Sequence, residues 1–315
     1  MSMEPNVIES EAATAAGAGT LHLPDVTLIC VDTANPDLAM RAIRHSMQLV
    51  EFGAVVFVTR PQHGLSDIPA SLTLITDQPV RSSAEYSIFM LQRLRPFVQT
   101  SHCLVVQWDG FVLDPAMWSD AFLQFDYIGS VWPYYSDGHR VGNGGFSLRS
   151  RRLLEALADP GIRHYHPEDR CIARTHRELL EQRHGIRFAD EASAHRFANE
   201  SMFMLPSSFG FHGMINLQRA FSPQEFEDFM AHAPNSLFAA HATRVFIKDA
   251  LRQGQTALAA RALRRRRAVR KIDLGDVRLW LRLYRSRLLD LFRRPPSGVP
   301  QFKPTPNVHS RSRGR

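Results

Sequence analysis

The fold class is decided by residues 26–60, VTLICVDTANPDLAMRAIRHSMQLVEFGAVVFVTR. VTLICVD (26–32) and AVVFVTR (54–60) are β-branched, apolar runs, which are typical of buried strands. Residues 36–53 between them carry apolar side chains at helical spacing and end at Gly53, a residue type that often ends helices. Strand, helix and strand with short links predict a βαβ unit and therefore a parallel sheet.

The same alternation continues along the chain. Three further strands and two helices are predicted, in chain order, at 72–76, 83–98, 103–109, 116–125 and 126–132. After them we expect a Gly-rich loop, edge strands at IRFAD and HRFANES, a loop at 205–213, and helices at 150–158, 168–184, 222–232 and 236–270. The expected fold is an α/β, Rossmann-type, mostly parallel sheet flanked by helices, with a C-terminal helical extension.

Composition excludes several classes of protein. The chain has 315 residues, 44% of them apolar, without the run of about 18 apolar residues that a membrane-spanning helix needs. Residues 1–24 lack a basic region followed by an apolar one, so we expect a disordered leader and not a secretory signal. The cysteines Cys30, Cys103 and Cys171 lie far apart, which favours free thiols in a reducing cytoplasm.

Charge divides the chain into an acidic body and a basic tail. Residues 261–315 hold 17 Lys and Arg against three Asp, a net charge of +14. The first 260 residues hold 21 basic and 28 acidic groups, a net charge of −7. Any affinity for polyanions is therefore expected in the tail. The chain is thus predicted to consist of the disordered leader over 1–24, a domain over 25–220, a helical extension over 221–260, a basic amphipathic segment over 261–294 and a disordered tail over 295–315.

Asp109 ends the predicted strand CLVVQWD (103–109), after Gln107 and Trp108. Asp-Gly is a common turn pair, which makes a simple turn one interpretation. The other is a ligand at the carboxyl end of a parallel strand, where open α/β sheets bind their ligands. A carboxylate there would suit a divalent metal and a nucleotide diphosphate.

The Gly-rich loop is Gly142-Asn143-Gly144-Gly145. Glycines allow the backbone to approach a ligand closely. The loop is predicted to open a helix, whose N-terminal amides would favour an anion. It lacks both the GxGxxG pattern and a Walker lysine, which excludes a dinucleotide fingerprint and an ATPase P-loop. A flexible turn and a substrate loop both remain open.

Two further segments carry groups that could do chemistry. Pro167-Glu168-Asp169 has the residues of an ordinary helix start, and one of its carboxylates could also act as a general base. His212 lies between Phe211 and Gly213, where an imidazole could be a metal ligand or a diphosphate contact.

Taken together and in order, these blocks resemble a family of largely uncharacterised glycosyltransferase-like domains. The blocks are VQWDGFVLD, DYIGSVWP, VGNGGFSLRSRRLLEAL, PEDRCIAR, ASAHRFANES and FGFHG. The resemblance covers roughly residues 25–217 and is densest over 105–213. That family is similar to nucleotide-sugar glycosyltransferases, so the resemblance implies a GT-A-like sheet and sugar transfer to a hydroxyl acceptor.

The resemblance also implies roles for residues. In such enzymes an Asp-x-Asp motif binds Mn or Mg on the sugar nucleotide, and here Gln107 stands at its first position, which leaves Asp109. His212 matches the late histidine that completes the metal shell. Asp169 or Glu168 matches the catalytic base. The implied donor-binding residues are Asp32, Thr33, Gln107 and Asp109, and the implied acceptor loop is formed by Gly142, Asn143, Gly144, Gly145 and Arg149.

The implied partners are a nucleotide-sugar donor and a glycan or lipid-linked acceptor, as in bacterial surface glycan assembly. In the segment 261–294, Leu279, Leu283, Leu288 and Phe292 form an apolar stripe among arginines, which predicts contact with an anionic membrane or packing on the body. We therefore expect a cytoplasmic protein, peripheral on the inner membrane face, without specific nucleic-acid binding. The alternatives are a catalytically degenerate binding domain and a protein that binds anionic polymers through its tail.

Overall fold

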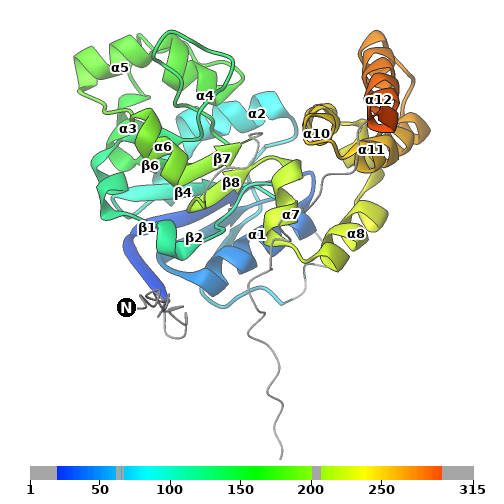
Figure 1. The fold of residues 1–315 in the computed structure, drawn as a ribbon. Helices are drawn as coiled ribbons and strands as arrows, with labels where there is room; N and C mark the ends of the chain where they lie inside the picture. Colours follow the sequence, from blue (N-terminus) through cyan, green and yellow to red (C-terminus); the bar gives the residue numbers. More distant parts are fainter. Residues whose placement is uncertain (1–19, 62–64, 66, 201–206, 293–315) are drawn as a thin grey trace, which may run out of the picture.

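The computed structural model describes residues 20–61, 65, 67–200 and 207–292. A six-stranded sheet with strand order β3-β2-β1-β4-β6-β5 forms its centre (Figure 1). The strands are β1 (Leu21–Val31), β2 (Val50–Val58), β3 (Leu72–Ile75), β4 (His102–Val106), β5 (Tyr127–Gly129) and β6 (Ser147–Ser150). β1 pairs in parallel with β2 and β4, and β2 pairs in parallel with β3, which confirms the predicted α/β class with a mostly parallel sheet.

The predictions were wrong at β6. This strand runs antiparallel to both β4 and β5, and all four of its residues are buried. The Gly-rich loop therefore opens a strand and not a helix, so the argument from helix N-terminal amides does not hold. The predicted helix begins later, as α3 (Arg151–Ala156). The segment is a strand because β4 and β5 pair with it from both sides, and such pairing cannot be predicted from the local sequence.

The two faces of the sheet are covered by different helices. Side chains of β1 alternate between the faces, with Leu28 and Cys30 in one core cluster and Ile29 and Val31 in the other. The first face is covered by α1 (Pro36–Leu49). The second is covered by the segment of residues 83–97 together with α3, α4 (Glu168–Arg170) and α5 (Arg177–His184).

Two predicted helices are irregular. The one expected at 83–98 is an α-helix over Ser83–Ile88 (α2), a π-helical turn over Phe89–Arg93 and a 3-10 turn over Arg95–Phe97. The one at 116–125 consists of two 3-10 turns. The segment at 168–184 is likewise interrupted by a π-helical turn over Cys171–Thr175. Each deviation leaves the segment in its expected place between strands.

A small second sheet lies beside the loop that follows β4. Its strands β7 (Ala198–Glu200) and β8 (Gly210–His212) run parallel, and a bridge from Val112 to Gly210 joins it to the loop after β4. HRFANES was predicted as a strand, but its first part belongs to helix α6 (Glu191–Phe197). The predicted loop at 205–213 ends as β8, while its residues 205 and 206 lie outside the described residues.

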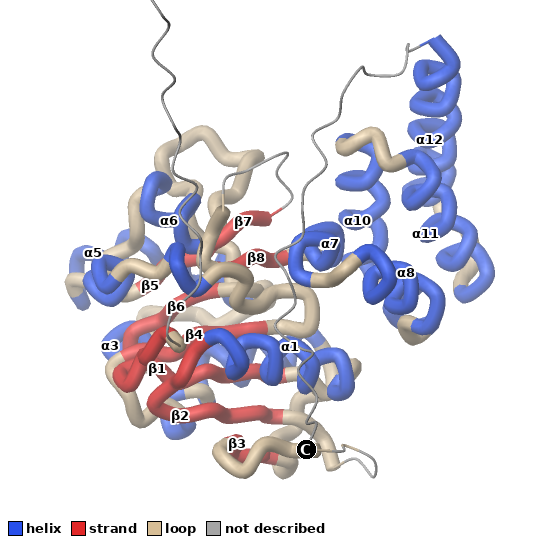
Figure 2. Tube along the Cα trace, turned by 60° about the horizontal axis from the view of Figure 1, so that its bottom comes forward, coloured by secondary structure: helices blue, strands red, loops and turns tan. Residues whose placement is uncertain are grey.

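The C-terminal part is a set of helices beside the sheet (Figures 1 and 2). After a 3-10 turn at Met214–Asn216, they are α7 (Leu217–Ala220), α8 (Pro223–His232), α9 (Asn235–Ala239), α10 (His241–Arg252), α11 (Thr256–Val269) and α12 (Leu274–Phe292). Three helices thus replace the single one predicted at 236–270, and the predicted boundary at 260 falls inside α11. No helix among the described residues is both long and apolar enough to cross a membrane.

Candidate functional site

Asp109 lies at the tip of a tight turn that follows β4. The backbone N–H of Gln107 donates to the carbonyl of Gly110 over 2.8 Å, and the N–H of Gly110 donates back over 3.0 Å. The Asp109 side chain is nevertheless buried, with 6% of the residue exposed. The residue therefore takes part in a turn, as Asp-Gly predicts, and also presents its carboxylate to neighbouring elements.

His212 is the neighbour that Asp109 faces. Its Nε2 lies 3.7 Å from Oδ1 of Asp109, and its Nδ1 lies 3.1 Å from Oε1 of Glu200. Glu200 and His212 are register partners in the pair β7–β8, which sets their side chains next to each other. Glu200 was missed in the sequence, because only this strand pairing brings it to the site.

Burial and charge shift the pKa values of these groups. Burial raises the pKa of the Asp109 carboxyl, and the negative charges of Asp32 and Glu200 add to the shift against the opposing effect of His212. Burial alone would lower the pKa of His212, but Asp109 and Glu200 outweigh it and raise that pKa to about 9. The two carboxylates thus favour the protonated imidazole, and a metal ion that binds His212 would have to displace that proton.

The Gly-rich loop packs between this group and the Glu-Asp pair. A Cβ atom built on Gly145 would lie 2.1 Å from Nε2 of His212. One built on Gly144 would lie 2.7 Å from Oε1 of Glu168 and 2.9 Å from Cβ of Asp169. The loop needs glycine at both positions because side chains approach it from both sides.

A Gly145→Ala substitution should therefore displace His212. We expect a loss of about 1–3 kcal/mol in the free energy of unfolding, as for other insertions into packed sites. Urea titration of the variant measures it, with Gly161→Ala as the control, because a Cβ there first meets a carboxylate oxygen at 3.1 Å. Equal stability of the two variants would contradict the packing described here.

Glu168 and Asp169 have different surroundings. Glu168 is buried and accepts a hydrogen bond from Nη2 of Arg149 over 3.0 Å, within an ion pair whose arginine is fully buried. Asp169 accepts from the N–H of Gly144 over 3.4 Å and from the N–H of Arg170 over 2.7 Å. Burial, and then the charge of Glu168, raise the pKa of Asp169. Glu168 is thus the counter-ion of Arg149, whereas no arginine side chain among the described residues donates a hydrogen bond to Asp169.

Arg149 was predicted in a substrate loop, and its position contradicts that. It lies inside β6 with none of its surface exposed, its Nε donates to Ser147 over 3.0 Å, and its guanidinium lies 5.5 Å from the centre of the Tyr127 ring. A substrate cannot reach a side chain that is enclosed in this way. Arg149 therefore supports the site as a structural residue and does not contact a substrate.

The other predicted site residues take part in local hydrogen bonds. Oδ1 of Asp32 accepts from the N–H groups of Ala34 and Asn35, and the Thr33 hydroxyl donates to the carbonyl of Val80 over 2.6 Å. Nε2 of Gln107 donates to the Tyr86 hydroxyl over 3.0 Å. Asp32 still acts on Asp109 through its charge, so the ends of β1 and β4 contribute to one electrostatic environment. In the loop, Oδ1 of Asn143 accepts from the N–H of Gly145 over 3.0 Å.

The residues present fit a divalent ion only in part. Asp109 offers a carboxylate oxygen, and His212 offers an imidazole whose other nitrogen is held by Glu200, an arrangement common behind metal ligands. Within the described ranges, no group of three His, Cys, Asp or Glu side chains is placed to hold a metal by itself. An ion here would therefore need oxygen ligands from a bound substrate, as diphosphates supply to Mg²⁺.

Comparison with protein families gives one match. Residues 70–212 match the model of a family described as "Protein of unknown function (DUF5672)". This range contains the turn of Asp109, the Gly-rich loop, the Glu-Asp pair and His212. No curated protein matches the sequence.

Solved structures similar to the chain include several glycosyltransferases. The apo-form glycosyltransferase GlyE of Streptococcus pneumoniae TIGR4 is 10% identical, with 60% of this chain and 54% of that one covered and a TM-score of 0.37, so the match spans about half of GlyE. The mannosyltransferase PcManGT of Pyrobaculum calidifontis, solved with GDP-Man and Mn²⁺, is 12% identical, with 88% and 84% covered and a TM-score of 0.38. An active-site mutant of LgtC is 10% identical, with 67% and 98% covered and a TM-score of 0.39. Likenesses this distant carry no conclusion about the reaction of this chain.

Proposed function

We propose that this protein is a glycosyltransferase that moves a sugar from a nucleotide-sugar donor to a hydroxyl acceptor. One observation carries the proposal: a carboxylate–imidazole pair, Asp109 and His212, and a separate half-buried carboxylate, Asp169, lie on opposite sides of one glycine loop. Sugar transfer needs these two functions, positive charge at a leaving diphosphate and a base for the incoming hydroxyl.

Asp169 is the proposed base. Its raised pKa makes it a stronger proton acceptor than an exposed aspartate, and Glu168 cannot replace it while neutralising Arg149. In the proposed step Asp169 takes the proton of the acceptor hydroxyl as that oxygen bonds to the anomeric carbon. The bond from that carbon to the diphosphate breaks, and the nucleoside diphosphate leaves with the electron pair.

Asp109 and His212 are proposed to receive the diphosphate side of the donor. With the diphosphate oxygens, Asp109 and His212 would hold Mn or Mg, which supplies positive charge to the leaving group. Asp32 and Thr33, at the end of the adjacent strand β1, are proposed to lie beside the nucleoside. Glu200 orients the His212 ring through Nδ1.

The acceptor is proposed to be a glycan or a lipid-linked sugar that reaches Asp169 from the open side of the loop. Tyr134 is 68% exposed, its ring stacks on Trp132 at 6.5 Å between centres, and Asp169 and Glu200 both act on its hydroxyl through their charge. An exposed aromatic face beside the base suits the apolar face of a sugar ring. Tyr134 could not be predicted from the sequence, since no local pattern distinguishes it from other tyrosines.

A donor screen tests the proposal. UDP-, GDP-, CMP- and dTDP-sugars are added to the full chain with and without Mn²⁺, and the melting temperature is measured. A donor at about 100 times its Kd should stabilise the protein by about 2.7 kcal/mol. Asp109→Ala should remove this stabilisation, whereas Asp228→Ala, an exposed carboxylate on α8, should retain it.

Other outcomes would assign the domain differently. Stabilisation that is independent of Mn²⁺ and of Asp109 would remove the proposed donor site. Binding of a donor without transfer to any glycan would favour a degenerate binding domain. Gln107 also favours that alternative, because its amide donates to Tyr86 at a position where a metal motif with two carboxylates would have an aspartate. Absence of stabilisation by all four nucleotide classes would contradict sugar transfer.

A further inference from the structure

Helix α12 carries an exposed apolar stripe. Along the helix, apolar residues recur at alternating steps of three and four, so they share one side. They are Leu274, Val277, Leu281, Tyr284 and Leu288. Leu274 is 78% exposed, Leu281 65% and Tyr284 66%, and Val277 and Leu288 are 44% and 41% exposed. An uncovered row of this length on a helix indicates an interaction surface.

The opposite side of α12 packs against the neighbouring helices. Leu279 and Leu283 are buried, at 2% and 1% exposed, in the core that α12 shares with α10 and α11. The stripe is therefore not the face that packs on the body. The apolar stripe predicted from the sequence combined residues of both faces, since Leu279 and Leu283 are buried and Leu288 is 41% exposed, and Phe292 lies where side chains are not described.

The arginines of the extension separate into two groups. Those facing the interior are neutralised: Arg266 is 1% exposed and pairs with Asp276 over 2.8 Å, and Arg244 and Arg270 contact Asp273 and Asp276. Those beside the stripe are exposed and form no ion pair with any described residue; they are Arg278, Arg282, Arg285 and Arg287. The second group therefore offers positive charge to a partner, as do the exposed Arg264 and Arg267 of α11.

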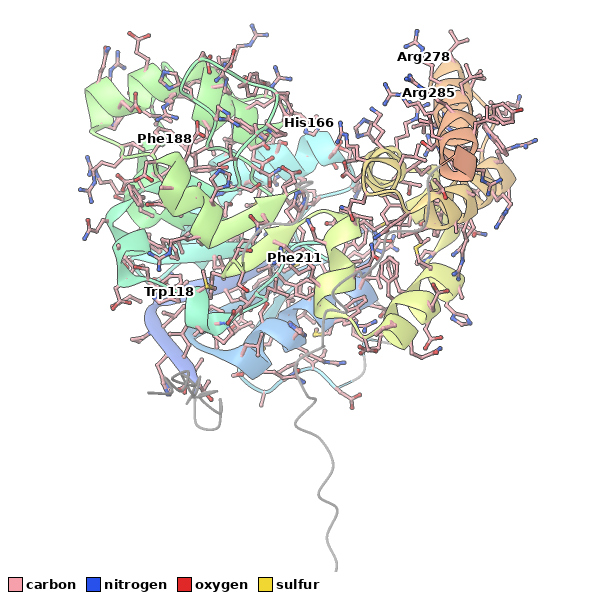
Figure 3. The ribbon with its side chains drawn as sticks, viewed as in Figure 1. Trp118, His166, Phe188, Phe211, Arg278 and Arg285 are labelled. Carbon is pink, nitrogen blue, oxygen red and sulfur yellow. The ribbon has the colours of Figure 1, made fainter. Side chains whose placement is uncertain are left out.

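These exposed arginines flank the stripe. Figure 3 places Arg278 and Arg285 on α12, at the part of the molecule that stands away from the sheet. On the side of Trp280, Arg267 of α11 lies over the indole ring at 5.5 Å, so that side is basic as well. The surface is thus an apolar row with aromatic residues, bordered by uncompensated arginines.

We infer that the α12 stripe docks the protein onto an anionic lipid surface. Helices that lie in the membrane interface combine an apolar row, aromatic residues and arginines in this way. A second copy of the chain is disfavoured, because pairing two stripes would set arginines against arginines. Nucleic acid would use the arginines but leave the leucines in water. This surface is separate from the candidate site and does not depend on the proposed transfer.

Vesicle flotation of the full chain tests the inference. We expect the protein to float with vesicles of phosphatidylcholine mixed with phosphatidylglycerol, and to stay behind with phosphatidylcholine alone. Leu281→Glu with Tyr284→Glu should weaken the partition by about 100-fold or more, because it removes apolar contact and adds repelled charge. Arg278→Gln with Arg285→Gln should weaken it by about 25-fold, from about fivefold for each arginine near an anionic surface.

Control variants distinguish a loss of docking from a loss of stability and from a loss of positive charge elsewhere on the protein. Ile68→Glu changes an apolar residue that is 41% exposed and distant in sequence, and Arg95→Gln with Arg163→Gln removes the same charge elsewhere. All variants should stay within about 1 kcal/mol of the wild-type free energy of unfolding, since their side chains are exposed. Absence of flotation, flotation that ignores lipid charge, or flotation unchanged by the α12 variants would each overturn the inference. A dimer in sedimentation velocity that the α12 variants dissociate would overturn it in favour of a second copy.

Discussion

An Asp169→Asn substitution is expected to lower the transfer rate by about 10²–10⁴-fold, the usual contribution of a general base. Asparagine keeps one oxygen, which can accept from the N–H of Arg170 over 2.7 Å, and loses only the longer bond of 3.4 Å from the N–H of Gly144, so the stability of the protein should change little. Donor binding should remain, because Asp109 and His212 lie on the other side of the loop. The measurement is kcat with the donor found in the screen, together with the donor's Kd.

The pH dependence gives an independent check. Burial and Glu168 raise the pKa of Asp169, and a base works only when it has lost its proton. The rate should therefore rise with pH through a pKa well above that of an ordinary aspartate, and this acidic limb should disappear in the asparagine variant. Glu178→Gln, an exposed carboxylate on α5, should retain both the rate and the limb. An asparagine variant as active as wild type would exclude Asp169 as the base.

The largest effect on stability is expected from Arg149→Met. Arg149 is fully buried and pairs with Glu168, of which 5% is exposed. Its removal therefore leaves a buried carboxylate without its charge partner. Breaking a buried ion pair from one side costs about 3–5 kcal/mol. Urea unfolding of wild type and variant, monitored by the fluorescence of the four tryptophans, measures this cost directly.

A double-mutant cycle assigns the cost to the pair. Adding Glu168→Gln to Arg149→Met removes the second charge, so the double variant should be more stable than the sum of the single effects predicts. The control is the pair of Arg95 and Glu155, whose side chains are 52% and 47% exposed, and whose disruption should cost about 0–1 kcal/mol. A loss of that small size at Arg149 would mean that the buried pair does not hold the loop in place.

The sequence by itself determined the α/β class and the place of Asp109. Apolar runs of strand length separated by a helix with 3.6-residue spacing are local signals, and the parallel strands β1, β2 and β4 form where these signals occur. Asp109 could be located because it directly follows such a run. Asp-Gly also predicted a turn, and the turn of Gln107 to Gly110 is present.

Only the tertiary structure decided which groups meet. Ser147–Ser150 becomes a strand because β4 and β5 pair with it from both sides, and this buries Arg149 against Glu168. Glu200 reaches His212 through the register of β7 and β8. In α12, the core selected one face and left the other exposed. Contacts between segments distant in the chain fix these outcomes, and such contacts leave no period or spacing in the sequence from which they could be predicted.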